Sequence, residues 1–278
     1  MDANQTPRFE PMTTGVLLDR AFRLYTNNFS LMLGITATAY VPFYLIMLIF
    51  QSSLGVNARS RSGDISTLIL NLAFIIVFVL LWASIAFPIA GGAATYAISE
   101  RYLGNDITIG AALRRGLRCF WTLSLAEITA TVRMLIGFLL FFIPGILWML
   151  SYALIVPVIL VEGQKAIPSL RRSRDLLKGY RGKAFCVLLV IIVLELILGA
   201  GAGMISNLFF NTDSAGGALL HSAVGNLVSI LMTPLFVIAT ILLYYDMRIR
   251  KEGFDLEMLS RAIATNPEPV AAAPTLSR

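Results

Sequence analysis

Long apolar runs dominate this sequence and alternate with short segments that hold most of its charged residues. A helix needs about 20 largely apolar residues to cross the roughly 30 Å hydrocarbon core of a bilayer. Six runs are candidates for such spans: 31–50, 68–89, 121–142, 146–161, 184–208 and 224–245. The fourth is short and follows Pro144-Gly145, so we expect it to form a tight hairpin with the third. Gly91-Gly92 after Pro88 predicts a break where the second run ends.

These runs are apolar on all sides, which is typical of helices and not of barrel strands with alternating polarity. In lipid, only helices and closed barrels satisfy every backbone polar group. We therefore expect an all-α protein, a polytopic transmembrane helix bundle with six spans over residues 13–260. A cytoplasmic segment, 1–12, would precede it, and a Pro/Ala-rich disordered cytoplasmic tail, 265–278, would follow.

The basic residues lie almost wholly on one side of this arrangement. Of the 22 Lys and Arg, 19 fall in the two terminal segments and in loops 97–120 and 162–183. Only Arg59 and Arg61 fall on the other side, and Arg133 lies inside a span. Because cytoplasmic loops carry the excess of Lys and Arg, this predicts a multi-pass inner-membrane protein with both ends in the cytoplasm. The net charge of +6 then reflects topology and not nucleic-acid binding, since no nucleic-acid-binding motif accompanies it.

Each cytoplasmic segment also predicts an amphipathic interfacial helix just before a span. The first covers 13–25, and Thr108 is the expected N-cap of the second. In the third, 166–181, the residues Arg171, Arg174, Lys178 and Arg181 recur at helical spacing and form an interfacial basic stripe. Such a helix can lie in the headgroup plane and bind anionic lipid headgroups. Alternatively, the stripe is a topology signal packed on the cytoplasmic face of the bundle.

Three segments and a turn carry a resemblance to a known family: LLDRAFRLYTNNF (17–29), PVILVEGQKAIPSLRRSRDLLKGYRGK (157–183), LLYYDMRIRKEGFDLEML (242–259) and the IPG turn (143–145). Over most of residues 13–260 the chain resembles the six-helix membrane-domain family named after glycerophosphoryl diester phosphodiesterase. The resemblance implies that fold but no activity. The phosphodiesterase barrel to which such domains are joined needs paired histidines and a metal-binding carboxylate cluster. This chain has a single histidine, His221.

Other catalytic signatures are missing from the sequence, which has no GxxxxGK[ST] loop, no HExxH and no cysteine cluster. A Ser–His–Asp triad would have to use His221, which we expect to be a solvated histidine in or near the outward loop that holds Asp213. We therefore expect no enzyme activity, no cofactor and no metal.

Charged residues inside the spans are the sharper signal. Glu127 and Arg133 fall in the third span and Glu195 in the fifth, each at a cost of about 2.5–3.5 kcal/mol at mid-helix. Glu127 and Arg133 are too far round the helix to share a face. At 1.5 Å per residue, Arg133 and Glu195 lie about 18 and 16 Å from the cytoplasmic ends of their spans, which predicts that they pair. Glu127 would lie nearer the cytoplasmic interface.

Two functions remain from this pattern. The first is a non-enzymatic scaffold or interaction module that engages the lipid bilayer, anionic headgroups or a membrane-protein partner at the cytoplasmic face. The alternative is a small-solute or lipid transporter that uses Glu127, Arg133 and Glu195. An intramembrane enzyme ranks third.

Overall fold

The computed structural model describes residues 11–54, 65–102, 104–210 and 214–253, nearly all of which lie in helices or in the turns between them. No strand occurs in this part of the chain. The predicted tail 265–278, most of the segment 1–12, and Arg59 and Arg61 lie outside the described residues.

Five helical segments are long and apolar enough to cross a membrane, so the chain is a helical membrane protein. These segments are Phe29–Ile46 within α2 (Phe29–Leu54), Phe120–Leu140 (α7), Phe142–Glu162 (α8, Phe142–Tyr152, followed by α9, Ile155–Glu162), Arg181–Phe209 (α11), and Gly216–Glu252 within α12 (Ala215–Glu252). Four of the six predicted apolar runs are confirmed as continuous long helices, and the fourth run, 146–161, lies on the consecutive helices α8 and α9.

The remaining run falls on three consecutive helical pieces, α4 (Ile65–Leu81), η1 (Trp82–Ala86) and α5 (Phe87–Tyr102). Its crossing of the membrane stays a prediction. The expected break at Gly91-Gly92 was wrong, because α5 runs on to Tyr102. The irregularity comes earlier: η1 is a π-helical turn, in which the Phe87 N–H bonds to Trp82 O. Pro88, the second residue of α5, has no N–H to donate to the Ser84 carbonyl.

A proline inside a helix leaves one backbone carbonyl without its usual N–H donor. Hydroxyl groups of neighbouring helices lie within hydrogen-bond distance of two such carbonyls. Ser124 Oγ of α7 donates to Ser84 O at 2.7 Å. In α12, Pro234 cannot donate to Ile230 O, and Thr36 Oγ1 of α2 lies 3.3 Å from that oxygen and 3.0 Å from Met32 O of its own helix. Such bonds matter in lipid because no water is present to replace them.

Three short helices carry the predicted amphipathic patterns: α1 (Thr14–Asn27), α6 (Ile109–Arg118) and α10 (Ala166–Leu177). The Thr108 N-cap is confirmed, since its hydroxyl accepts a hydrogen bond from Ala111 N at 3.3 Å. Helix α6 packs very closely on α5: a Cβ added at Gly116 would lie 3.0 Å from both Ala93 N and Ile89 O.

The third amphipathic helix is shorter than predicted. Helix α10 ends at Leu177, Lys178 is its C-cap, and Arg181 is the first residue of α11. Gly179 has a φ of +89°, in the left-handed region that ends helices. The prediction of one continuous stripe through Arg171, Arg174, Lys178 and Arg181 was therefore wrong, because only Arg171 and Arg174 lie on α10.

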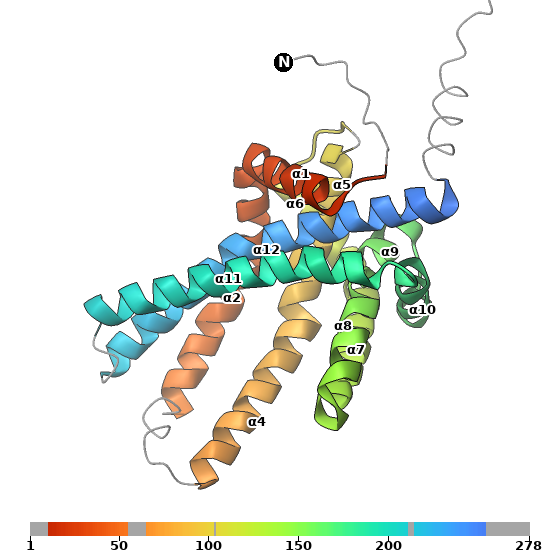
Figure 1. Cartoon of the computed structure of the whole chain (residues 1–278). Coiled ribbons are helices and arrows are strands. Elements are labelled where there is room, and N and C mark those ends of the chain that lie inside the picture. Colours follow the sequence, from red (N-terminus) through yellow and green to blue (C-terminus); the bar gives the residue numbers. More distant parts are fainter. Residues whose placement is uncertain (1–10, 55–64, 103, 211–213, 254–278) are drawn as a thin grey trace, which may run out of the picture.

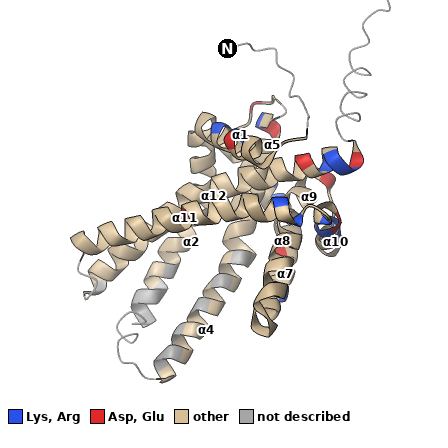
Figure 2. Ribbon diagram, in the orientation of Figure 1, with Lys and Arg blue, Asp and Glu red and all other residues tan. Residues whose placement is uncertain are grey.

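Helix α12 lies at the centre of the hydrophobic core. Ile238, Leu243 and Tyr244 have no exposed surface, and α12 contacts α1, α2, α5, α9, α10 and α11. The α11–α12 pair runs crosswise to α4, α7 and α8 (Figure 1). Described charged residues gather where α1, α5, α10 and the end of α12 lie, a region called here the charged end (Figure 2).

Candidate functional site

Two adjoining cavities lie between the helices and are open to the surroundings, with volumes of about 400 and 150 Å³ and mainly apolar walls. Both are bounded by residues of α5, α7, α11 and α12. The five lining residues that they share are Phe87, Glu127, Met134, Ile192 and Phe236. Because of these common walls we treat them as one site, the acidic cavity.

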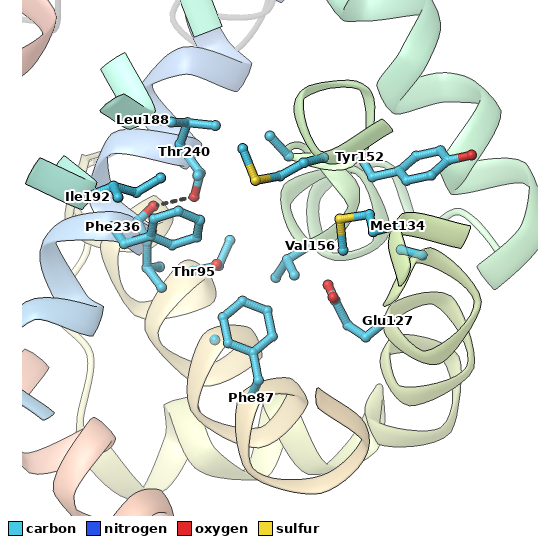
Figure 3. Close-up of a pocket in the computed structure, with 15 residues that line it drawn as sticks. Phe87, Thr95, Glu127, Met134, Tyr152, Val156, Leu188, Ile192, Phe236 and Thr240 are labelled. Atoms are coloured by element: carbon cyan, nitrogen blue, oxygen red, sulfur yellow. Dashed lines mark hydrogen bonds between the residues drawn. The ribbon is translucent and has the colours of Figure 1, made fainter. Parts of the chain in front are cut away.

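Glu127 of α7 points its carboxyl group into this cavity, toward Val156 and Phe87 (Figure 3). No described residue forms a hydrogen bond or an ion pair with that carboxyl group. Helix α7 brings Glu127 inward because Leu123, Ala126 and Ala130, which are almost fully buried, share its side of the helix.

Glu195 of α11 is an exposed side chain that lines the larger part of the acidic cavity together with Glu127. Tyr44, Ser229 and Thr233 also line that part. The structure thus places on one cavity two of the three charged residues that the transporter alternative uses. An isolated carboxylate is costly among apolar groups, so the carboxyl group of Glu127 either holds a proton or meets a cationic group of a ligand.

Arg133 does not pair with Glu195, contrary to the expectation from their depths. Its Nη1 donates to the Tyr152 hydroxyl at 3.2 Å. The Nη2 of Arg174, from α10, donates to the same hydroxyl, also at 3.2 Å. Equal depth did not bring Arg133 to Glu195, because α11 crosses α7 and α8 instead of running along them (Figure 1).

The two guanidinium groups at Tyr152 are close together and have the same charge. Their donor nitrogens lie within about 6.4 Å of each other, since each is 3.2 Å from one oxygen. At an effective dielectric constant of about 20, two unit charges at that separation repel by about 3 kcal/mol. No described carboxylate pairs with either arginine, so this repulsion is not offset within the described residues.

A break between α8 and α9 positions Arg174 beside Tyr152. Ser173 Oγ of α10 donates to Ser151 O at 2.8 Å and accepts from Leu154 N at 3.1 Å. The sequence analysis missed both Tyr152 and Ser173. The available signal was Pro157, which has no N–H for the Ala153 carbonyl and so predicts an irregular turn at this point.

The remaining stripe residues are not brought together. Arg171 is exposed on α10, and the Lys178 backbone carbonyl accepts from Lys251 Nζ at 2.7 Å. The Arg181 Nε is buried without a described partner.

Two clusters of ion pairs at the charged end hold helices together. In the first, the fully buried Asp246 accepts from Met12 N, Lys183 and Arg250. In the second, Arg172 pairs with Glu162 at 2.8 Å and with Glu252 at 2.5 Å. Burial lowers the pKa of Arg172, but the hydrogen bonds to the two carboxylates outweigh it, so the pKa is raised. Several residues that carry the family resemblance therefore join α9, α10, α11 and α12.

His221 was expected in or near a loop, but it lies on α12. Its Nδ1 is 2.6 Å from Ser206 Oγ of α11. Ser206 is almost fully buried and also donates to Gly203 O within its own helix. The contact joins α11 to α12.

Among the described residues no group of three or more His, Cys, Asp or Glu side chains could hold a metal ion. Comparisons with known proteins leave the family open: no family model, no curated protein and no solved structure matches this chain. The resemblance to the six-helix membrane-domain family stays a prediction.

Proposed function

We propose that this chain is a six-span inner-membrane protein, with its charged end and both termini in the cytoplasm, that transports a small solute or a lipid through the acidic cavity. One observation carries the proposal: Glu127 and Glu195 line an open cavity of about 400 Å³ between the helices, and no described residue pairs with either. Charged residues inside a bilayer are costly and commonly mark substrate or proton pathways. The six-helix family resemblance is part of this proposal for the fold.

The walls of the cavity suggest how it would work. Phe78, Trp82, Phe87 and Phe236 provide aromatic surface, which suits the apolar part of a membrane-soluble molecule and the face-on approach of a cation. The two carboxyl groups would hold a cationic group or exchange a proton as the substrate enters and leaves. Catalysis has no support here, since no nucleophile with a paired base lines the cavity among the described residues.

The test uses purified protein and a panel of small alkylammonium compounds as probes, scored by the shift of the thermal unfolding midpoint. Binding of a probe to the folded state raises the midpoint. Glu127→Gln and Glu195→Gln should each reduce this shift and stay folded. Asp106→Asn serves as the matched control, since Asp106 is exposed on the α5–α6 turn. The same shift in all three variants would rule out the cavity as the binding site.

A second function is favoured by a separate observation. Arg114 and Arg118 of α6 and Arg171 and Arg174 of α10 are exposed. We therefore propose that the charged end also acts as an interaction surface for anionic headgroups or a membrane-protein partner. Co-flotation of anionic vesicles with the protein held in neutral-lipid nanodiscs should weaken as salt rises if this attraction is electrostatic. Binding that is indifferent to both salt and lipid charge would contradict it.

A further inference from the structure

Two arginines from different helices meet at one phenol oxygen, and neither has an acidic partner among the described residues. Arg133 of α7 and Arg174 of α10 each donate to Tyr152 Oη at 3.2 Å. The Arg174 guanidinium carbon also lies 5.9 Å from the centre of the Tyr152 ring. Because the phenol oxygen is neutral, these contacts leave the positive charge of both groups uncompensated.

We propose that Arg133 and Arg174 form a binding site for a phosphate group, either of an anionic lipid headgroup or of free phosphate. A phosphate carries the opposite charge and several acceptor oxygens, and the planar guanidinium group matches its geometry. Each arginine uses one nitrogen on Tyr152 and keeps further N–H donors for a ligand. A phosphate bound there would turn the repulsion between the two cations into attraction to a shared anion.

Tyr152 and Ser173 act as positioning residues for this site. Tyr152 is 5% exposed and its side chain extends away from the acidic cavity, with the hydroxyl at its outer end (Figure 3). Ser173 fastens α10 to the break between α8 and α9 through two hydrogen bonds. The two guanidinium groups are therefore held together before a ligand arrives, which lowers the ordering cost of binding.

The position of the pair favours a lipid as the source of the phosphate. Arg133 lies in α7, a helix apolar enough to cross a membrane, while Arg174 is exposed on α10 at the charged end. The inference rests on the second proposal, that the charged end meets lipid headgroups, and it uses neither carboxyl group of the acidic cavity, although Tyr152 also lines the smaller part of that cavity.

The test measures lipid retention by the purified full-length protein in detergent, with native mass spectrometry as the readout. Phosphatidylglycerol and phosphatidylcholine are the probes. Wild type should retain phosphatidylglycerol preferentially. Arg174→Gln should weaken that retention about tenfold, as expected for the loss of a charge-assisted hydrogen bond. Arg171→Gln is the matched control, an exposed arginine on the same helix, and should retain the lipid like wild type.

Arg133→Gln and Arg133→Lys extend the test to the apolar helix, with the thermal unfolding midpoint as the check that each variant is folded. Both should lower retention, since lysine keeps the charge but not the planar donors. Equal losses in the Arg171 and Arg174 variants would overturn the site while leaving a diffuse basic surface. If the wild type does not prefer phosphatidylglycerol, both the phosphate site and the diffuse basic surface are ruled out. Glu127→Gln should retain the lipid, whatever its effect on the acidic cavity.

A competition arm identifies the source of the phosphate. Release of bound phosphatidylglycerol by inorganic phosphate, but not by chloride at equal ionic strength, would assign the site to free phosphate as well as lipid. Retention in both salts would assign it to the lipid headgroup. Equal release by both salts would show attraction without a built site and would overturn the proposal.

Discussion

The ammonium group of Lys183 lies 2.5 Å from Oδ2 of Asp246, a carboxylate without exposed surface. The other oxygen of Asp246 accepts a hydrogen bond from Met12 N at 2.6 Å. Lys183 and Arg250 each also donate to Met12 O. These bonds join the N-terminal segment to α11 and α12, and they explain why a fully buried acid is tolerated in this core.

Asp246→Asn should therefore destabilise the fold by about 2–3 kcal/mol. That is less than the roughly 3–5 kcal/mol for breaking a fully buried pair, because Lys183 and Arg250 keep some contact with water. The free energy of unfolding in detergent, followed by tryptophan fluorescence, checks it. Asp106→Asn makes the same chemical change at an exposed acid and should stay within about 0.5 kcal/mol of wild type.

Ser173→Ala should cost about 1–3 kcal/mol, because it leaves Leu154 N and Ser151 O without their described partner in a buried place. Ser169→Ala is the control. Ser169 is equally buried, but its hydroxyl bonds only to Ala166 O within α10. Thermal unfolding of the two variants should rank Ser173→Ala well below Ser169→Ala, and equal midpoints would count against the role of Ser173 at the break.

Gly116→Ala and Gly110→Ala should have opposite effects although both lie on α6. A Cβ at Gly116 would meet backbone atoms of α5 at 3.0 Å, so the two helices would have to move apart. A Cβ at Gly110 would meet nothing within 4 Å, and alanine there should stabilise the helix by about 1 kcal/mol. Unfolding midpoints show whether each variant is stabilised or destabilised. A stabilised Gly116 variant would contradict the close approach of α5 and α6.

Arg133 and Glu195 should show no energetic coupling, although the sequence suggested a pair. In a double-mutant cycle, Arg133→Ala and Glu195→Ala should be additive within about 0.5 kcal/mol. Arg133→Ala and Tyr152→Phe remove two ends of one hydrogen bond and should be coupled by about 0.5–3 kcal/mol. A large coupling in the first cycle and none in the second would contradict the observed contacts.

Labelling with a membrane-impermeant thiol reagent tests the proposed orientation. Cys119 and Cys186 are first replaced, and cysteine is then placed at the exposed positions Lys165 or Ser214. In intact cells the Ser214 position should react and the Lys165 position should not, whereas both should react after permeabilisation. The reverse pattern would place the charged end outside the cell.

The sequence by itself determined the elements that depend on local or periodic features. Runs of apolar residues are long enough to require helices in lipid, and five of them form such helices. A threonine before an amphipathic run predicted the start of α6, because capping involves only neighbouring residues. The end of α10 also depends on a local feature, the positive φ of Gly179, which the sequence-based prediction did not use.

Only the tertiary structure decided which side chains meet. Counting residues at 1.5 Å each gives the position of Arg133 and Glu195 along their own helices, but not the direction in which each helix crosses its neighbours. The crosswise α11–α12 pair brings Glu195 to the cavity of Glu127, while Arg133 bonds to Tyr152 beside α10. Likewise, Pro88 predicts that the Ser84 carbonyl lacks its usual donor, but only the packing of α7 brings the Ser124 hydroxyl to that oxygen. Such contacts join residues far apart in the chain, and no local pattern encodes them.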